Sequence, residues 1–216
     1  MHYVVADIHN NYERFTKLLK KIDFSKGDKL YILGDIFDRS DYNPQPLEVY
    51  YEILKLKDSC KVLAGNHDYL LADYILAYYN TPEKKRKKIP EYRYNTFEIL
   101  SNRLPVADML RLAANIYNWS FEEEIEVGKH IFLLAHAMTT KPGVICDKSV
   151  YMYGDENFYK KGTEGYISVC GHYNPSGNLI WKNDIENVYL IDCGAGYKSG
   201  RLGCLRLEDF KEFYVE

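Results

Sequence analysis

Six side chains with metal-binding chemistry occur just after short apolar runs of the sequence. They are Asp7, His9, Asp35, Asn66, His136 and His172. The apolar runs have the length and the β-branched content of buried strands. Because the carboxyl ends of strands in an open α/β sheet converge on one crevice, blocks that are 28 to 70 positions apart in the chain are expected to meet there.

The donor types indicate which metal the site binds and how many ions it holds. Carboxylate and amide oxygens mixed with imidazole nitrogens suit manganese, iron or zinc better than calcium or magnesium. Six ligands are too many for one ion that keeps positions open for substrate, whereas two ions can share one bridging carboxylate. The sequence therefore predicts two divalent metal ions as cofactors, with manganese favoured and iron or zinc as alternatives.

Each ligand block has a simpler interpretation when it is taken alone. Asp-x-His and Gly-Asn-His-Asp also occur as turns or helix caps, in which the polar side chains bond their own backbone. Four of the six histidines nevertheless stand at strand ends, namely His9, His67, His136 and His172. This coincidence favours one shared site over five unrelated turns.

Hydrophobic periodicity predicts the elements that position these residues. Strands are expected over 3–6, 30–33, 61–64, 131–135, 167–170, 188–191 and 204–207, with the acidic run 122–124 at an exposed strand edge. Amphipathic helices over 12–22, with Asn10 as N-cap, and over 47–56 alternate with the first three strands, which predicts parallel crossovers. We interpret the helical stretch at about 68–118 as a small cap insert, and the later Gly-rich and Asn-rich turns favour a more antiparallel second sheet. Residues 1–216 are expected to form a single domain.

Composition excludes several classes of function. The chain has 216 residues and a net charge of −3, so no general electrostatic attraction draws it to nucleic acid or to an anionic membrane, and neither is expected as a partner. The sequence has no apolar run long enough to cross a bilayer, and its start lacks the basic and apolar segments of a signal peptide. We therefore expect a cytoplasmic protein.

Taken together, the blocks resemble the calcineurin-like metallophosphoesterases, in particular the branch of phosphoprotein phosphatases and symmetrical diadenosine tetraphosphatases. The resemblance extends from Asp7 to His172 and rests on Asp-x-His, Gly-Asp-x-x-Asp-Arg, Gly-Asn-His-Asp, His-Ala and Gly-His. It implies an α/β fold of four layers, in which two mixed β-sheets pack as a sandwich flanked by helices. It also implies a metal-dependent phosphatase whose nucleophile is a hydroxide that bridges the two metal ions.

The resemblance also implies a role for each site residue. Asp7 and His9 would bind the first ion, and Asp35 would bridge the two ions. The ligands of the second ion would be Asn66, His136 and His172. Asp38 and His67 resemble the acid dyad of the family, in which the histidine protonates the leaving group. Arg39 resembles the arginine that binds the substrate phosphate.

The sequence departs from the family pattern in three ways. Asn10 and Ser40 replace glycines that usually follow Asp-x-His and Asp-Arg. The stretch 146–170 has no arginine, although the family normally carries a second phosphate-binding arginine there. Lys160 or Lys161 could supply a charge at this place, but a lysine lacks the bidentate fork of arginine.

Three functions are consistent with the sequence. The favoured one is a phosphomonoesterase similar to the serine/threonine protein phosphatases, which acts on a phosphorylated protein, a peptide or a small phosphoester. The alternative is a hydrolase of diadenosine polyphosphates, with Tyr92, Tyr94 and Phe97 of the cap insert as a stacking surface for adenine. The third is an inactive metal-binding interaction module. The basic run 84–88 is either a solvated helix face or a surface that steers anionic substrates.

Overall fold

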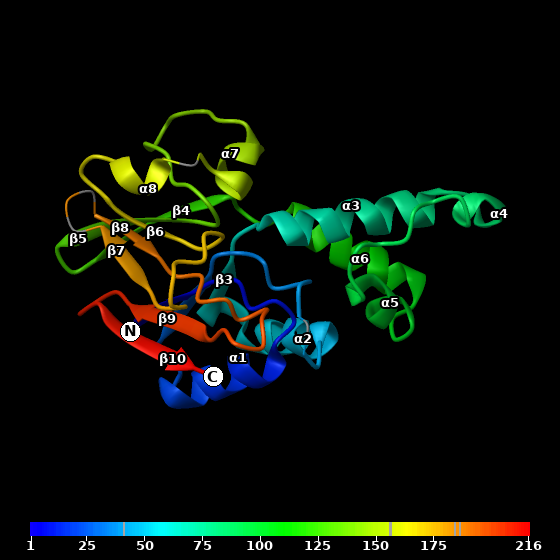
Figure 1. Ribbon diagram of the computed structural model, residues 1–216, viewed down its shortest axis with the longest axis horizontal. Coiled ribbons are helices and arrows are strands. Elements are labelled where there is room, and N and C mark those ends of the chain that lie inside the picture. Colours follow the sequence, from blue (N-terminus) through cyan, green and yellow to red (C-terminus); the bar gives the residue numbers. More distant parts are fainter. Residues whose placement is uncertain (41, 156, 184, 186) are drawn as a thin grey trace.

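The computed structural model describes residues 1–40, 42–155, 157–183, 185 and 187–216, which form two five-stranded sheets and flanking helices (Figure 1). The first sheet has the order β10-β9-β1-β2-β3 and consists of β1 (His2–Val5), β2 (Lys29–Ile32), β3 (Cys60–Val62), β9 (Leu202–Arg206) and β10 (Lys211–Val215). Strands β1, β2 and β3 run parallel, as the alternation of strands and helices predicted, while β9 and β10 are antiparallel to their neighbours.

The second sheet is also mixed, with the order β4-β5-β6-β8-β7. Its strands are β4 (Glu122–Val127), β5 (His130–Ala135), β6 (Ile167–Cys170), β7 (Trp181–Asn183) and β8 (Val188–Leu190). Its three central strands are parallel, and only the two edge strands pair antiparallel. The expectation of a more antiparallel sheet was therefore wrong, because a long crossover joins β5 to β6 and permits parallel pairing. The acidic run 122–124 lies in the edge strand β4, as predicted.

The helices fall into three groups along the chain. The first group is α1 (Tyr12–Lys21), α2 (Pro46–Leu56) and the 3-10 turn η1 (Lys57–Ser59); the second is α3 (Asn66–Asn80), α4 (Glu83–Arg86), α5 (Thr96–Ser101) and α6 (Val106–Tyr117); the third is α7 (Lys148–Tyr153) and α8 (Phe158–Lys161). Figure 1 places α1 and α2 beside the first sheet, α7 and α8 beside the second, and α3 to α6 as a projection to one side.

Alternating side chains of the strands build the layers. Tyr3 and Val5 of β1 belong to a buried cluster shared with α1 and α2, whereas Val4 between them belongs to a cluster with Phe132 of β5, between the two sheets. A third cluster packs Phe158 of α8 against the outer face of the second sheet. The order helix, sheet, sheet, helix confirms the predicted four-layer fold.

The projection formed by α3 to α6 shares its core with the first sheet. Leu71 and Ile75 of α3 and Leu112 and Ile116 of α6 belong to the same buried cluster as the inner residues of α1 and α2. This shared core agrees with one domain that carries an insert. The division of the chain into domains stays a prediction. Figure 1 shows α4, which carries much of the basic run 84–88, at the far end of α3, remote from the strand ends.

The start of α1 differs from the expected cap. Asn11, rather than Asn10, is the N-cap, and its side chain accepts a hydrogen bond from the backbone N–H of Arg14. Asn10 has a left-handed φ of 61° and its side-chain amide donates to Thr96 Oγ1 of α5 at 2.9 Å. Asparagine tolerates this conformation better than most residues, so it can stand where the family usually has glycine.

Among the described residues, no helix is both long enough and apolar enough to span a membrane.

Candidate metal centre

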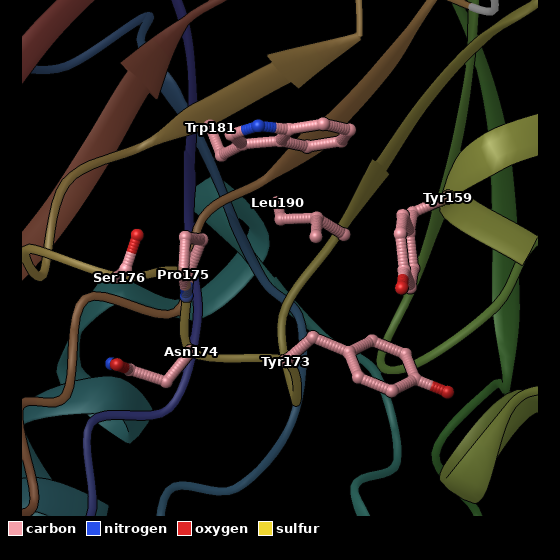
Figure 2. Close-up of a pocket in the computed structure, with 7 residues that line it drawn as sticks. All are labelled: Tyr159, Tyr173, Asn174, Pro175, Ser176, Trp181 and Leu190. Carbon is pink, nitrogen blue, oxygen red and sulfur yellow. The ribbon is translucent and has the colours of Figure 1, made fainter. Parts of the chain in front are cut away.

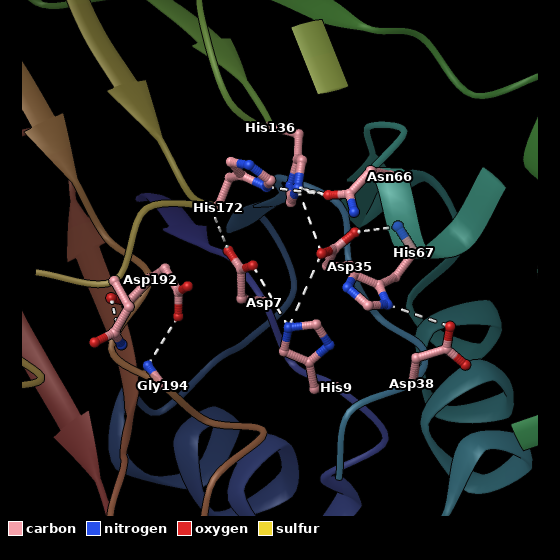
Figure 3. A network of polar contacts seen from close by, with 12 residues as sticks. Asp7, His9, Asp35, Asp38, Asn66, His67, His136, His172, Asp192 and Gly194 are labelled. Atoms are coloured by element: carbon pink, nitrogen blue, oxygen red, sulfur yellow. Dashed lines mark hydrogen bonds and ion pairs between the residues drawn. The ribbon is translucent and has the colours of Figure 1, made fainter. Parts of the chain in front are cut away.

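The six predicted ligands lie together where the strand ends converge (Figure 3). The chain supplies them in order: Asp7 and His9 after β1, Asp35 after β2, Asn66 after β3, His136 after β5 and His172 after β6. Ligand atoms of Asp7, His9 and Asp35 lie within 4.8 Å of one another, and so do those of Asp35, His136 and His172. Asp35 is thus common to both groups, at the position to which the resemblance assigned the bridge.

Asn66 lies beside the second of these groups. Its side-chain Oδ1 is 2.9 Å from His136 Nε2 and 3.0 Å from His172 Nδ1. Asn66 is the first residue of α3, so the helix start fixes its position relative to the end of β5. An amide oxygen that faces two imidazole nitrogens is well placed to join them as a metal ligand.

Three buried polar atoms of the first group lack a hydrogen-bond partner within the described part of the chain. They are Asp7 Oδ1, His9 Nε2 and Asp35 Oδ2. His9 Nε2 lies 3.6 Å from Asp7 Oδ1 and 3.9 Å from Asp35 Oδ2. A buried polar atom without a partner costs about 1–3 kcal/mol, and native proteins nearly always pair such atoms. A cation between the three would satisfy all of them, so this donor set fits a metal ion.

Backbone carbonyls orient two of the histidines toward the centre. Nδ1 of His9 lies 2.9 Å from the Phe37 carbonyl oxygen, and Nδ1 of His136 lies 2.7 Å from the Leu33 carbonyl oxygen. In a neutral imidazole the nitrogen that faces a carbonyl carries the hydrogen, which leaves the Nε2 lone pair free to bind metal. Burial lowers the pKa of His9 to about 3, so its ring is already in the metal-binding form at neutral pH.

The pKa values of the two buried carboxyl groups are shifted upward, opposite to that of His9. Burial, with help from Asp192 and Asp35, raises the pKa of Asp7 well above its usual value. Burial and the neighbouring Asp68 raise the pKa of Asp35 in the same way. Desolvation and like charges both favour the protonated acid, whereas a divalent cation favours the carboxylate. Bound metal would therefore displace protons from Asp7 and Asp35.

Six of the predicted site residues have left-handed backbone conformations, with φ between 49° and 66°. They are Asp7, His9, Asp35, Asp38, Arg39 and His172. Such a conformation costs a non-glycine residue about 1–3 kcal/mol and persists only where the surroundings enforce it, most often at functional sites. The turns that follow the strands thus hold these side chains in place at the expense of local stability.

Two glycines make room for the carboxylates. A Cβ atom on Gly65 would overlap Asp35 Oδ1, and one on Gly171 would overlap Asp7 Oδ2. Neither glycine has a positive φ, so the close approach of the ligands is the reason for these residues.

Asp68 supports the site, a role that the sequence analysis did not assign. Its Oδ2 accepts hydrogen bonds from the backbone N–H of Asp35 at 2.8 Å and of Gly65 at 3.1 Å, and its Oδ1 accepts from Ile36 at 3.0 Å. The carboxylate therefore ties the turn after β2 to the start of α3. The available sequence signal was an acidic residue three positions after the helix cap, a known capping pattern.

The proposed acid dyad lies beside the first group of ligands. His67 Nδ1 is 3.3 Å from Asp38 Oδ2, and the His67 ring packs edge-on against the His9 ring with 5.3 Å between centroids. The His67 backbone N–H donates to Asp35 Oδ1 at 2.9 Å. Arg39 follows Asp38 in the same turn. Burial lowers the pKa of Arg39, but the nearby Tyr197, Asp35 and Asp7 outweigh burial, so the net effect is a raised pKa. Its guanidinium therefore stands in a strongly anionic site.

The insert contributes two aromatic residues to the dyad. The Tyr92 hydroxyl donates to Asp38 Oδ2 at 2.5 Å, and the Tyr94 ring lies 5.1 Å from the His67 ring between centroids. Phe97 is buried among the core residues, with 9% of its surface exposed. Phe97 is therefore too buried to take part in the adenine surface expected on Tyr92, Tyr94 and Phe97. Tyr92 and Tyr94 are half-buried beside the dyad, and stacking of a base on them stays a prediction.

The other departures from the family pattern also have definite places. The Ser40 hydroxyl donates to the Tyr42 carbonyl at 2.7 Å and stays within its own loop. Lys160 Nζ donates to Asn157 Oδ1 at 2.8 Å and lies 5.7 Å from the centroid of the Tyr159 ring. Lys160 thus lies in α8 at the edge of an aromatic surface, and its role in place of the second arginine stays a prediction.

A four-layer fold with carboxylates and imidazoles gathered at converging strand ends is the kind of site in which hydrolases hold two metal ions. A model of the calcineurin-like phosphoesterase family matches residues 3–197. The chain therefore belongs to this family, as the resemblance of its motifs indicated.

Two relatives of the chain are symmetrical bis(5'-nucleosyl)-tetraphosphatases. A symmetrical bis(5'-nucleosyl)-tetraphosphatase of Buchnera aphidicola subsp. Baizongia pistaciae (strain Bp) is 26% identical over 210 residues, which cover 95% of this chain and 64% of that protein. The protein of the same name from Buchnera aphidicola subsp. Acyrthosiphon pisum (strain Tuc7) is 43% identical over 67 residues, or 31% of this chain and 23% of that protein. The chain thus spans less than two thirds of the length of these relatives.

A solved structure of a candidate diadenosine tetraphosphatase superposes with a TM-score of 0.70 and covers 99% of this chain and 92% of the other. Its sequence identity is 17%, so the similarity shows a shared fold.

Proposed function

We propose that this chain is a hydrolase of phosphoric esters and anhydrides that uses two divalent metal ions, and that its substrates are dinucleoside polyphosphates. The observation that carries the proposal is the place of Asp35 in both ligand groups, because a carboxylate with two oxygens can serve two ions at once. The names of the relatives favour dinucleoside polyphosphates over the phosphoproteins that the sequence analysis preferred.

The site residues have distinct tasks in this proposal. The ligands of one ion would be Asp7, His9 and Asp35, and those of the other Asp35, Asn66, His136 and His172. When bound, the ions lower the pKa of water and polarise phosphoryl oxygens. The chain supplies the pocket, the neutral imidazoles and the two carboxylates that these ions require.

The remaining side chains act on the substrate. Arg39 presents the bidentate guanidinium that matches two phosphoryl oxygens and compensates their charge in the transition state. His67 donates a proton to the departing oxygen, and Asp38 orients the imidazole through its contact with Nδ1. Tyr92 fixes Asp38 in turn. Burial and the neighbouring Asp38 raise the pKa of Tyr92, so its hydroxyl keeps its hydrogen and acts as a donor.

A substrate panel tests the proposal. The purified protein is treated with a chelator, restored with manganese, and assayed on diadenosine tetraphosphate, a phosphopeptide and p-nitrophenyl phosphate. We expect the highest kcat/KM for diadenosine tetraphosphate, with two molecules of ADP as products. The Asp35→Asn variant, purified in parallel, reports any contaminating phosphatase.

The other outcomes of the panel each point to a different function. A clear preference for the phosphopeptide would overturn the substrate class and favour a protein phosphatase. AMP and ATP as products would contradict symmetrical cleavage. A protein that binds two manganese ions but turns over none of the three substrates would be the interaction module.

A further inference from the structure

An aromatic pocket adjoins the metal centre (Figure 2). It has a volume of about 450 Å³ and is lined by Tyr159, Tyr173, Asn174, Pro175, Ser176, Trp181 and Leu190. These residues come from α8, from the loop after β6, and from the neighbouring strands β7 and β8. The volume is within the range of small-molecule sites, which are mostly apolar with a few polar groups.

Three aromatic rings form walls of the pocket. The Tyr159 ring lies 5.8 Å from the Trp181 ring at 90° and 6.2 Å from the Tyr173 ring at 62°, measured between centroids. In Figure 2 the three rings surround Leu190, while the side chains of Asn174 and Ser176 lie on the side away from Tyr159. Trp181 keeps 37% of its surface exposed although it is large and apolar. Aromatic walls with polar groups at one side match a nucleobase, which has two apolar faces and a hydrogen-bonding edge.

The pocket shares a wall with the metal centre. Tyr173 follows the proposed ligand His172 directly, and their rings are 5.0 Å apart between centroids. The next residue, Asn174, donates from its side-chain amide to the carbonyl oxygen of Asp192 at 3.2 Å. A nucleoside in the pocket would therefore have its phosphate chain next to the metal ligands.

A positive charge lies next to this surface. Lys160 Nζ is 5.7 Å from the centroid of the Tyr159 ring, and its side chain is exposed. The ammonium group therefore adds positive charge at the edge of the aromatic surface, which favours an anionic ligand. None of the seven residues that line the pocket carries a charge, so the base itself would bind by stacking and hydrogen bonding.

We propose that this pocket, built on Tyr159, Tyr173 and Trp181, binds a nucleobase of the substrate. This inference rests on the proposed function, because it assigns a place to one end of a dinucleoside polyphosphate. It differs from the expectation of an adenine surface on the insert, since the pocket lies on the second sheet and α8.

Kinetics of Trp181 variants provide the first test. We expect Trp181→Ala to raise KM for diadenosine tetraphosphate about 5- to 160-fold, the range that corresponds to the loss of one base stacked on an aromatic ring. Its kcat/KM for p-nitrophenyl phosphate, which has no base, should stay within about twofold of the wild type. Trp181→Phe should restore most of the affinity. Tyr51→Ala, which removes an exposed aromatic from α2, should leave kcat/KM for both substrates unchanged.

A binding measurement separates this inference from the proposed function. The chain has two tryptophans, so Trp119→Phe leaves Trp181 as the only source of tryptophan fluorescence. In the manganese-loaded protein we expect adenosine to quench this fluorescence saturably and ribose to leave it unchanged. Adenosine has no phosphate to hydrolyse, so the result does not depend on turnover.

Each combination of results has one meaning. If the wild type cleaves diadenosine tetraphosphate but Trp181→Ala keeps the wild-type KM, the pocket assignment is overturned while the proposed function stands. If the wild type does not cleave it but adenosine quenches Trp181, the base pocket stands and the proposed function fails. Quenching by an aromatic peptide and not by adenosine would overturn the nucleobase assignment.

Discussion

Gly171→Ala is the substitution that most sharply tests how the fold positions a metal ligand. The added Cβ would stand 2.7 Å from Ala6 Cβ and would overlap Asp7 Oδ2. Carbon atoms prefer separations of about 3.5 Å or more, so something must move by about 0.8 Å. The backbone of Gly171 is in a region open to alanine, and steric displacement of Asp7 is therefore the dominant effect.

The displacement is large compared with what a metal site tolerates. Ligand distances in metal sites hold to about 0.2 Å, and even the loss of residues that support a ligand typically costs 10- to 100-fold in metal affinity or activity. We expect Gly171→Ala to bind manganese at least about 10-fold more weakly at one of the two sites. The overpacking itself should lower the free energy of unfolding of the metal-free protein by about 1–3 kcal/mol.

Gly128→Ala is the matched control for this experiment. Gly128 has a φ of 62° and nothing within 4 Å of a built Cβ, so the substitution strains the backbone without crowding a ligand. Manganese titration by calorimetry and urea unfolding would be run on both variants. We expect Gly128→Ala to lose stability and keep its metal affinity. Wild-type manganese affinity in Gly171→Ala would refute the reasoning, because Asp7 would then not need the position that the structure gives it.

Three further outcomes follow from the site. His67→Asn should lower kcat on an alkyl phosphate about 10²- to 10⁴-fold with unchanged metal content. The loss in kcat on diadenosine tetraphosphate should be smaller, because a phosphate leaving group needs little protonation. Full turnover of the alkyl ester would exclude the acid role. Tyr92→Phe removes the hydrogen bond to Asp38 and should lower kcat about 10-fold, with a larger loss on an alkyl phosphate than on nitrophenyl phosphate. An equal loss of kcat on both substrates would indicate a merely structural contact. Manganese affinity should rise from pH 5 to pH 8. The raised pKa values of Asp7 and Asp35 make their protons compete with the metal at the lower pH, whereas His9, with a pKa of about 3, is already neutral. A Kd for manganese that stays constant over this range would contradict this.

The metal centre could be predicted from the sequence because its residues follow strands. Asp7, Asp35 and His136 each come within two positions of an apolar run, and the convergence of strand ends is a general property of α/β sheets. The structure gathers all six candidates without any change to the set. Their individual roles as ligands stay predictions until metal is measured.

The supporting contacts could not be predicted in the same way. Tyr92 reaches Asp38 across 54 positions from a loop with no periodic pattern, and no rule of spacing indicates such a contact. The aromatic pocket depends on α8, which has four residues and is too short to leave a helical period in the sequence. The parallel centre of the second sheet was missed for the same reason, because the crossover from β5 to β6 carries only the short helices α7 and α8.

The metal content of the Asp35→Asn variant tests the central claim most directly. Elemental analysis would be made on wild type and variant after chelation, saturation with manganese and removal of free metal. We predict two manganese ions per chain in the wild type and fewer than two in Asp35→Asn, because the carboxylate common to both ligand groups is lost. Two ions per chain in the variant, held as tightly as in the wild type, would contradict a site built around a shared Asp35.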